Sequence, residues 1–137
     1  MANESKLDTN ILLDVLLDRV PFVANSSAIW AACDAGRIVG YIPASTLTDI
    51  FYIARRATDV PTARVVVGLC LAVFEIAPVA RQTLEQAAML PGNDFEDNVQ
   101  IACAMIARLD AIVTRNPGDF THTSIPVLTP PALVTRL

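Results

Sequence analysis

Residues 93–120 constrain the fold of this chain most, because they combine a helix, a buried strand and a turn in one short stretch. Asp94 precedes a run of apolar residues at helical spacing, so it is placed to cap a helix. Residues 111–114 are short, apolar and β-prone, and residues 115–119 have the composition of a turn. A helix that leads directly into a buried strand is typical of an α/β sheet.

The rest of the chain repeats this alternation of strands and helices. We expect strands at residues 2–7, 39–42, 74–77, 111–114 and 127–128. We expect helices at residues 10–18, 21–36, 45–56, 59–73, 80–90, 95–109 and 130–136. Strands that alternate with helices predict a parallel sheet, and the length predicts one domain over residues 1–137.

Four aspartates lie next to predicted strand ends or helix starts. Asp8 follows the first strand, and Asp49 lies near the start of the helix after the second. Asp97 is in the first turn of the helix after Asp94, and Asp119 follows the strand at 111–114. Since chemistry in open α/β sheets lies outside the carboxyl ends of the strands, we expect the four side chains to converge. Clustered carboxylates repel one another unless a cation lies among them, and oxygen-only ligands select Mg²⁺ or Mn²⁺.

Each aspartate also has a purely structural interpretation. Asp8 could cap the first helix, and Asp49 could form a capping box with Thr46. Asp97 could be a first-turn carboxylate that the helix dipole favours, and Asp119 a turn residue. We assign Glu96, which lies beside Asp97, to a solvated helix face.

Five motifs along the chain resemble those of one known family. In order they are Asp8-Thr9-Asn10-Ile11-Leu12-Leu13-Asp14, Thr46-Leu47-Thr48-Asp49-Ile50, Asp94-Phe95-Glu96-Asp97, Ile112-Val113-Thr114-Arg115-Asn116 and Asp119-Phe120. Their order and spacing resemble the PIN-domain ribonucleases, and in particular the VapC-like toxins of type II toxin–antitoxin modules. The resemblance implies a three-layer sandwich with a central parallel sheet flanked by helices. It also implies a metal-dependent endoribonuclease that cleaves single-stranded RNA.

The resemblance assigns roles to individual residues. The implied catalytic residues are Asp8, Asp49, Asp97 and Asp119, and the implied ligands of Mg²⁺ or Mn²⁺ are Asp8, Asp97 and Asp119. The implied substrate contacts are Thr9, Thr114, Arg115 and Asn116. An antitoxin protein is the implied partner.

Two features depart from the family pattern. Asp49 stands where the family commonly has Glu, and the first strand contains the polar run at residues 3–6. Both features favour an alternative, a catalytically impaired PIN-like interaction module. A phosphate-accepting receiver domain would need a lysine on a later strand, but Lys6 is the only lysine in the sequence.

Composition limits the remaining possibilities. The net charge of −4 and the pI of about 4.7 argue against a broad basic surface for duplex DNA. The sequence lacks a membrane-length apolar stretch and a signal-peptide pattern, so we expect a cytoplasmic protein without a membrane partner. Cys33, Cys70 and Cys103 are widely spaced in apolar helical patterns, so we expect free thiols in the core.

We also expect a homodimer. The apolar side chains of the early helices exceed what one core needs, and we expect them to form the interface. These side chains are Phe22, Ile29, Trp30 and Phe51.

Overall fold

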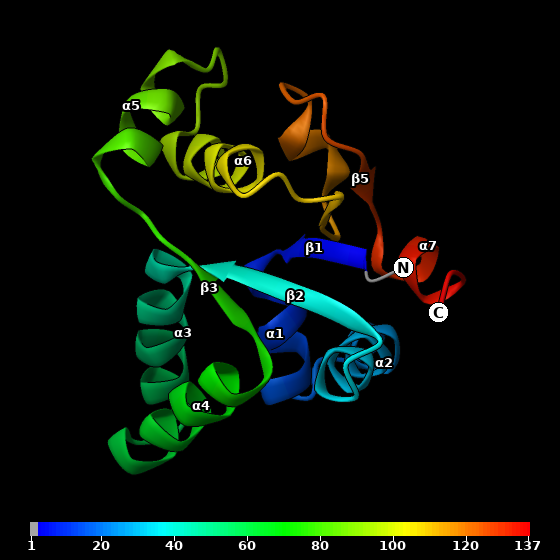
Figure 1. The fold of residues 1–137 in the computed structure, drawn as a ribbon. Helices are drawn as coiled ribbons and strands as arrows, with labels where there is room; N and C mark the ends of the chain where they lie inside the picture. The colour runs from blue at the N-terminus through cyan, green and yellow to red at the C-terminus, as the bar shows by residue number, and fades with distance from the viewer. Residues whose placement is uncertain (1–2) are drawn as a thin grey trace.

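The computed structural model describes residues 3–137 and shows a parallel five-stranded sheet with the order β3-β2-β1-β4-β5 (Figure 1). All four pairings between neighbouring strands are parallel. The strands are β1 (Asn3–Leu7), β2 (Ile38–Pro43), β3 (Glu75–Ala77), β4 (Ala111–Val113) and β5 (Val127–Leu128). The predicted parallel α/β sheet is therefore confirmed.

Helices cover both faces of the sheet, as a three-layer sandwich requires. Figure 1 shows α1 to α4 on one face, and α5 and α6 on the other. The helices are α1 (Thr9–Leu16), α2 (Val23–Asp34), α3 (Ala44–Ala57), α4 (Val60–Val73), α5 (Arg81–Met89), α6 (Phe95–Ile106) and α7 (Pro130–Val134). A short 3₁₀ helix, η1 (Pro117–Phe120), follows β4.

The central strand β1 sends alternate side chains to the two layers. Leu7 is fully buried in the core with residues of α1 to α4. Lys6 faces the opposite layer, where its Nζ lies 5.2 Å from the centroid of the Phe120 ring. On that side Ile112 of β4 packs with α6 and η1. The two faces of β1 therefore lie in chemically different surroundings.

β1 is the middle strand of the sheet, although the polar side chains of residues 3–6 made it a weak strand prediction. β1 pairs with β2 on one side and with β4 on the other, so both backbone edges are bonded. Asp110 extends the pairing, because its side chain accepts a hydrogen bond from the Glu4 N–H at 2.8 Å. Backbone pairing on both edges outweighs the polar side chains. Ala2, which we included in this strand, lies outside the described residues.

Helix ends differ from the sequence-based expectation in two informative places. We expected Ser45 or Thr46 to cap the third helix, but α3 begins at Ala44, directly after the extended Pro43, without a side-chain cap. We expected the sixth helix to reach residue 109, but α6 ends at Ile106. Arg108 adopts a positive φ of 54°, which ends the helix before β4. The predicted cap Asp94 is confirmed, since it accepts a hydrogen bond from the Asp97 N–H. Asp59, where we expected the fourth helix to start, caps α4 by accepting from the Thr62 N–H.

The three cysteines are free and buried, as predicted. Burial raises the pKa of the Cys33 and Cys70 thiols to about 11, which suits inert core side chains. Within residues 3–137, the longest apolar helices fall short of what crossing a membrane requires.

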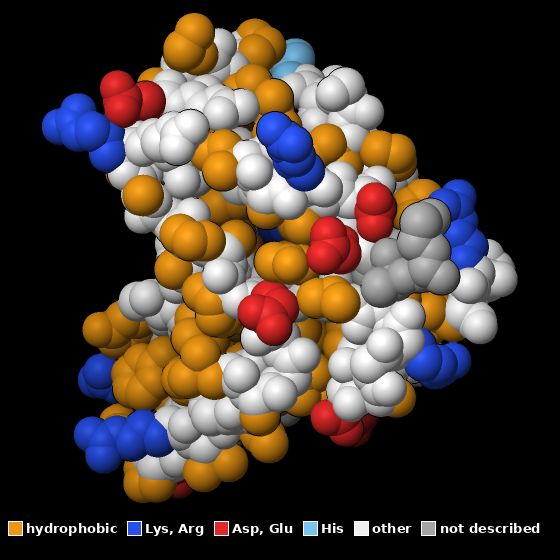
Figure 2. All heavy atoms as spheres, in the orientation of Figure 1, with side chains coloured by type: hydrophobic (Ala, Val, Ile, Leu, Met, Phe, Trp, Pro, Cys, Tyr) orange, Lys and Arg blue, Asp and Glu red, His pale blue; other side chains and the backbone are white. Residues whose placement is uncertain are grey.

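Exposed apolar side chains gather over α3 and α4, at the lower left of Figure 2. They include Tyr52, Val65, Leu69 and Leu71, which are between 47% and 62% exposed. The interface that we predicted from the early helices needs correction, because Ile29 is fully buried and Trp30 packs edge-on against Phe74. These two side chains belong to the core rather than to a docking surface.

Gly40 allows α2 and β2 to approach closely. A Cβ at this position would lie 2.8 Å from Cys33 Sγ and 2.9 Å from Phe74 Cδ1. We expect Gly40→Ala to lower the free energy of unfolding by about 1–3 kcal/mol through overpacking. Urea denaturation followed by circular dichroism measures this change.

Gly68 on α4 provides the matched control. A Cβ there has no atom within 4 Å, so Gly68→Ala should stabilise the protein by up to about 1 kcal/mol through helix propensity. Equal effects of the two substitutions would contradict the steric account of Gly40.

Candidate active site

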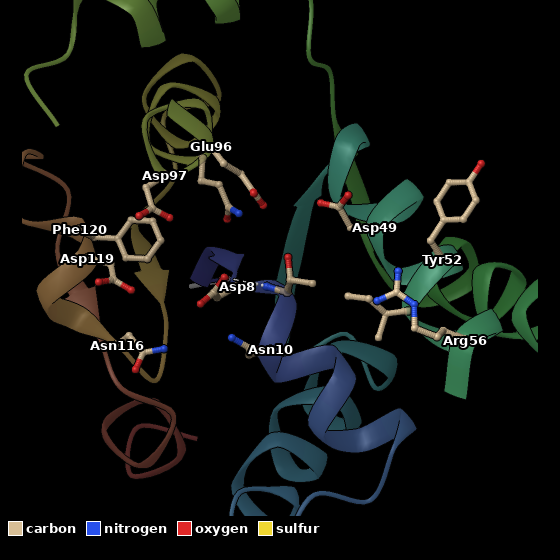
Figure 3. Close-up of a pocket in the computed structure, with 13 residues that line it drawn as sticks. Asp8, Asn10, Asp49, Tyr52, Arg56, Glu96, Asp97, Asn116, Asp119 and Phe120 are labelled. Atoms are coloured by element: carbon tan, nitrogen blue, oxygen red, sulfur yellow. Dashed lines mark hydrogen bonds between the residues drawn. The ribbon is translucent and has the colours of Figure 1, made fainter. Parts of the chain in front are cut away.

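A cavity of about 440 Å³ opens at the carboxyl edge of the sheet, beside the ends of β1 and β4 (Figure 3). Five carboxylates from four separate parts of the chain line it, namely Asp8, Asp49, Glu96, Asp97 and Asp119. Thr9, Asn10, Gln100, Asn116 and Arg56 add polar groups to its wall. The four aspartates that the sequence singled out therefore share one cavity.

Asp8 is held in place by hydrogen bonds to both of its carboxylate oxygens. The Thr9 N–H donates to Oδ1 at 2.9 Å, which makes Asp8 the N-cap of α1, and the Thr114 hydroxyl donates to Oδ2 at 2.9 Å. The backbone N–H of Asp8 donates to the carbonyl of Val113, also at 2.9 Å. The structural interpretation of Asp8 as a cap is thus correct, and the same contacts fix its carboxylate at the cavity.

Thr114 also organises the turn after β4. Its Oγ1 accepts a hydrogen bond from the Asn116 N–H at 3.0 Å, and its side chain is fully buried. Asn116 and Asp119 follow in this turn and in η1, and both side chains lie at the cavity in Figure 3. Thr114, which we predicted as a substrate contact, is not among the residues that line the cavity, whereas Thr9 and Asn116 are.

Asp97 lies in the first turn of α6, where Asp94 caps the helix and accepts from the Asp97 N–H at 3.0 Å. Burial raises the pKa of the Asp97 carboxyl to about 6, and neighbouring negative charges add to this shift. These neighbours are Asp94, Asp119, Asp8 and Glu96. Three of these neighbours, Asp119, Asp8 and Glu96, line the same cavity as Asp97, so the carboxylates there repel one another.

Asp49 and Glu96 face each other across the cavity (Figure 3). Asp49 lies in the second turn of α3, so its interpretation as part of a capping box is wrong. Glu96, which we assigned to a solvated face, is exposed but lines the cavity. Its pKa is raised by burial and by the charge of Asp49, in that order, with smaller effects from Asp94 and Asp8.

Arg115 is held outside the cavity. Its Nε lies 3.0 Å from Oδ2 of the fully buried Asp14, and its guanidinium lies 3.8 Å from the centroid of the Phe22 ring. The cation at the cavity wall is Arg56 on α3. The ion pair holds Arg115 on the α1 and α2 side of the turn that carries Asn116.

Comparison with known proteins agrees with this geometry. A family model of the PIN domain matches residues 6–117. The chain belongs to the PIN domain family. By sequence, no curated protein matches it.

Solved structures share the fold of this PIN domain. A toxin–antitoxin complex from Klebsiella pneumoniae is 25% identical, with 92% of this chain and 97% of that chain covered and a TM-score of 0.68. The DNA-bound VapBC of Salmonella typhimurium is 16% identical, with 95% and 99% covered and a TM-score of 0.72. VapC20 of Mycobacterium tuberculosis, a toxin that cleaves the sarcin–ricin loop, is 14% identical, with 79% and 86% covered and a TM-score of 0.63.

The donor set of the cavity suits a hard divalent ion that keeps part of its water shell. Among residues 3–137, no three acidic, histidine or cysteine side chains already form a compact metal site. Mg²⁺ binds proteins through one or two carboxylates and retains several waters, so it does not need a ready-made cage. Five carboxylates around one cavity, with Arg56 as the cation in its wall, supply both the ligands and the negative field.

The sequence interpretation missed three residues of this region, namely Glu96, Gln100 and Lys6. Gln100 lies one turn after Glu96 on α6, so helical spacing could have placed it at the same cavity. Lys6 immediately precedes Leu7 on β1, so strand alternation could have placed it under α6. Burial lowers the pKa of the Lys6 ammonium to about 8, and the charges of Asp8, Cys103, Asp97 and Glu96 oppose this shift.

The raised pKa of Asp97 predicts a pH-dependent cost in the metal-free protein. The folded-state pKa of about 6 exceeds the ordinary aspartate pKa of 3.8, so the ionised carboxylate destabilises the fold above pH 6 and the cost disappears below pH 4. We expect Asp97→Asn in EDTA at pH 7 to raise the free energy of unfolding by about 1 kcal/mol, after solvent screening and the lost helix-dipole interaction.

Thermal and urea melts between pH 4 and pH 8 measure this difference, with Glu85→Gln on α5 as an exposed control outside the cavity. The advantage of Asp97→Asn should shrink as the pH falls, because wild-type Asp97 then becomes neutral as well. If Asp97→Asn is less stable at every pH, Asp97 only stabilises the first turn of α6 and does not contribute repulsion to the cavity.

Proposed function

We propose that this PIN domain is a cytoplasmic, metal-dependent endoribonuclease that cleaves single-stranded RNA and acts as the toxin of a toxin–antitoxin pair. The observation that carries the proposal is the cavity in which five carboxylates meet and in which the pKa of Asp97 is raised to about 6. Perturbed carboxyl groups that converge in a cleft are typical of a functional site. We propose that residues 1–137 form the single domain that carries this activity.

Asp8, Asp97 and Asp119 would hold Mg²⁺ or Mn²⁺. When bound, such an ion lowers the pKa of a coordinated water and stabilises charge on a phosphodiester. The chain orients these ligands itself, because Thr114 and the Thr9 N–H fix Asp8 and the first turn of α6 carries Asp97. Asp49 lies on the opposite wall, where its carboxylate would orient a water molecule.

The start of α1 is suited to an RNA phosphate. Thr9 is the first residue of α1, and its Oγ1 is buried without a hydrogen-bond partner among the described residues. A helix N-terminus favours phosphate because its dipole is positive, although the Thr9 N–H itself is already bonded to Asp8. Asn116 offers an amide donor from the other side of the cavity. The substrate role of Arg115 would require it to give up its ion pair with Asp14, so Thr9 and Asn116 are the better supported contacts.

The alternative is an interaction module that has lost its activity, because Asp49 is one methylene shorter than the Glu common in the family. Glu96 weakens this alternative, since it brings a longer carboxylate into the cavity opposite Asp49. Mn²⁺ binding without RNA cleavage would favour the inactive module.

Two protein partners belong to the proposal, an antitoxin and a second copy of this chain. Structures similar to this one come from toxin–antitoxin complexes. The apolar surface over α3 and α4 offers a place for a protein partner, with a groove between the two helices lined by Leu47, Phe51 and Val67.

Loss of a proposed metal ligand should abolish cleavage. We expect Asp119→Asn and Asp97→Asn to cut single-stranded RNA at least about 100-fold more slowly in Mn²⁺, because the ion loses a ligand. Glu85→Gln should cleave at the wild-type rate. Rates are measured on a labelled mixture of single-stranded RNAs with Mn²⁺ and with EDTA. Cleavage at the wild-type rate in EDTA, or in both aspartate variants, would disprove the metal-dependent mechanism.

A homodimer should be visible in solution. We expect light scattering at high micromolar concentration to give twice the chain mass of 14.7 kDa. Leu69→Glu places a charge on the exposed apolar surface of α4 and should shift the mass toward that of one chain. A wild-type mass of 14.7 kDa would refute the dimer, and an unchanged dimer in Leu69→Glu would exclude this surface.

A further inference from the structure

Lys6 is a buried cation whose ammonium group lacks a hydrogen-bond partner within residues 3–137. It is the only lysine of the chain, it lies on the central strand β1, and its side chain is completely buried. A buried ammonium group is costly unless other charges compensate it, so its surroundings decide what it does.

The Lys6 ammonium group lies directly beneath the acidic cavity. Nζ lies 5.2 Å from the centroid of the Phe120 ring, and the Phe120 side chain lines the cavity. Three cavity carboxylates, Asp8, Asp97 and Glu96, interact electrostatically with the ammonium group. Lys6 is not among the residues that line the cavity, so RNA in the cavity would not touch it.

We propose that the Lys6 ammonium is an internal counter-ion of the acidic cavity, which holds the carboxylates together without metal and weakens the binding of divalent ions. Five carboxylates face one guanidinium in the cavity wall, so the cavity is strongly negative unless a cation joins it. Lys6 supplies one unit of positive charge from beneath the cavity. The inference rests on the proposed function, because it takes the cavity as the place where the metal binds.

Lys6 acts through the carboxylates and is therefore a positioning residue. A positive charge close to a divalent ion opposes its binding, and the effect is larger where protein rather than water fills the space between them. A buried unit charge beneath the cavity should change the affinity for a divalent ion by at least about tenfold, even after screening. If Lys6 only filled space in the core, an apolar residue of similar length would leave the metal affinity unchanged.

Mn²⁺ titration of the full chain at pH 7 by calorimetry tests the proposal without any activity measurement. Lys6→Met keeps the length of the side chain and removes the charge, and Lys6→Gln removes the charge while it keeps a polar end. We expect both variants to bind Mn²⁺ at least about tenfold more tightly than the wild type. Both should also gain more thermal stability from added Mn²⁺.

Ile112→Met is the matched control. Ile112 is the fully buried partner of Lys6 on β4, and this substitution changes the same core layer without changing its charge. Its Mn²⁺ affinity should equal that of the wild type. Circular dichroism confirms that each variant is folded, and Lys6→Gln serves as the test if Lys6→Met fails to fold.

The outcomes separate this inference from the proposed function. If the wild type binds Mn²⁺ and both Lys6 variants bind it equally well, the counter-ion role is wrong and the proposed function stands. If the wild type and both variants bind no Mn²⁺, both are wrong. If only the Lys6 variants bind Mn²⁺ measurably, the inference is supported in its strongest form.

Discussion

The place of β1 between β2 and β4 is the constraint on which the rest of this structure depends. A parallel strand bonded on both edges cannot shift its register without breaking two ladders at once. This register delivers Leu7 to one layer, Lys6 to the other and Asp8 to the carboxyl edge. Because Asp8 also caps α1, the same few residues position the first helix and the first carboxylate of the site.

The carboxylates of the cavity oppose the stability of the metal-free fold. Carboxylates that lie close enough to bind one ion also repel one another. This repulsion contributes, with burial, to the raised pKa values of Asp97 and Glu96. The fold withstands this repulsion because rigid elements carry the acids. Asp94 caps α6 one turn before the cavity, and Thr114 ties Asp8 to the end of β4. Function and stability therefore compete at a site that hydrogen bonds of the scaffold hold together.

Much of this architecture could be predicted from the sequence, because apolar periodicity and turn residues act locally. The alternation of strands and helices predicted the parallel sheet, and the four aspartates were placed at strand ends and helix starts that prove to meet. Glu96 and Lys6 escaped prediction because their surroundings come from distant segments. The exposed Glu96 looks solvated until α3 is placed opposite it, and a lysine in a strand looks unsuited to burial until the acids above it are known. Arg115 was misjudged for the same reason, since nothing nearby in sequence reveals Asp14 as its partner.

The pair formed by Asp14 and Arg115 has a consequence for how this protein can change over time. Asp14 is fully buried, and Arg115 leads directly into the turn that carries Asn116 and Asp119. A buried carboxylate tolerates the loss of its nearest cation poorly. Without Arg115, Asp14 would keep only the longer 3.8 Å contact with Arg19 and the Ser26 hydroxyl. Exchange of both residues together for a well-packed apolar pair would avoid that cost. A change from the ion pair to an apolar pair would pass through a destabilised single variant. Substitutions at positions 14 and 115 should therefore be rare and should occur together, even where the surrounding surface varies freely.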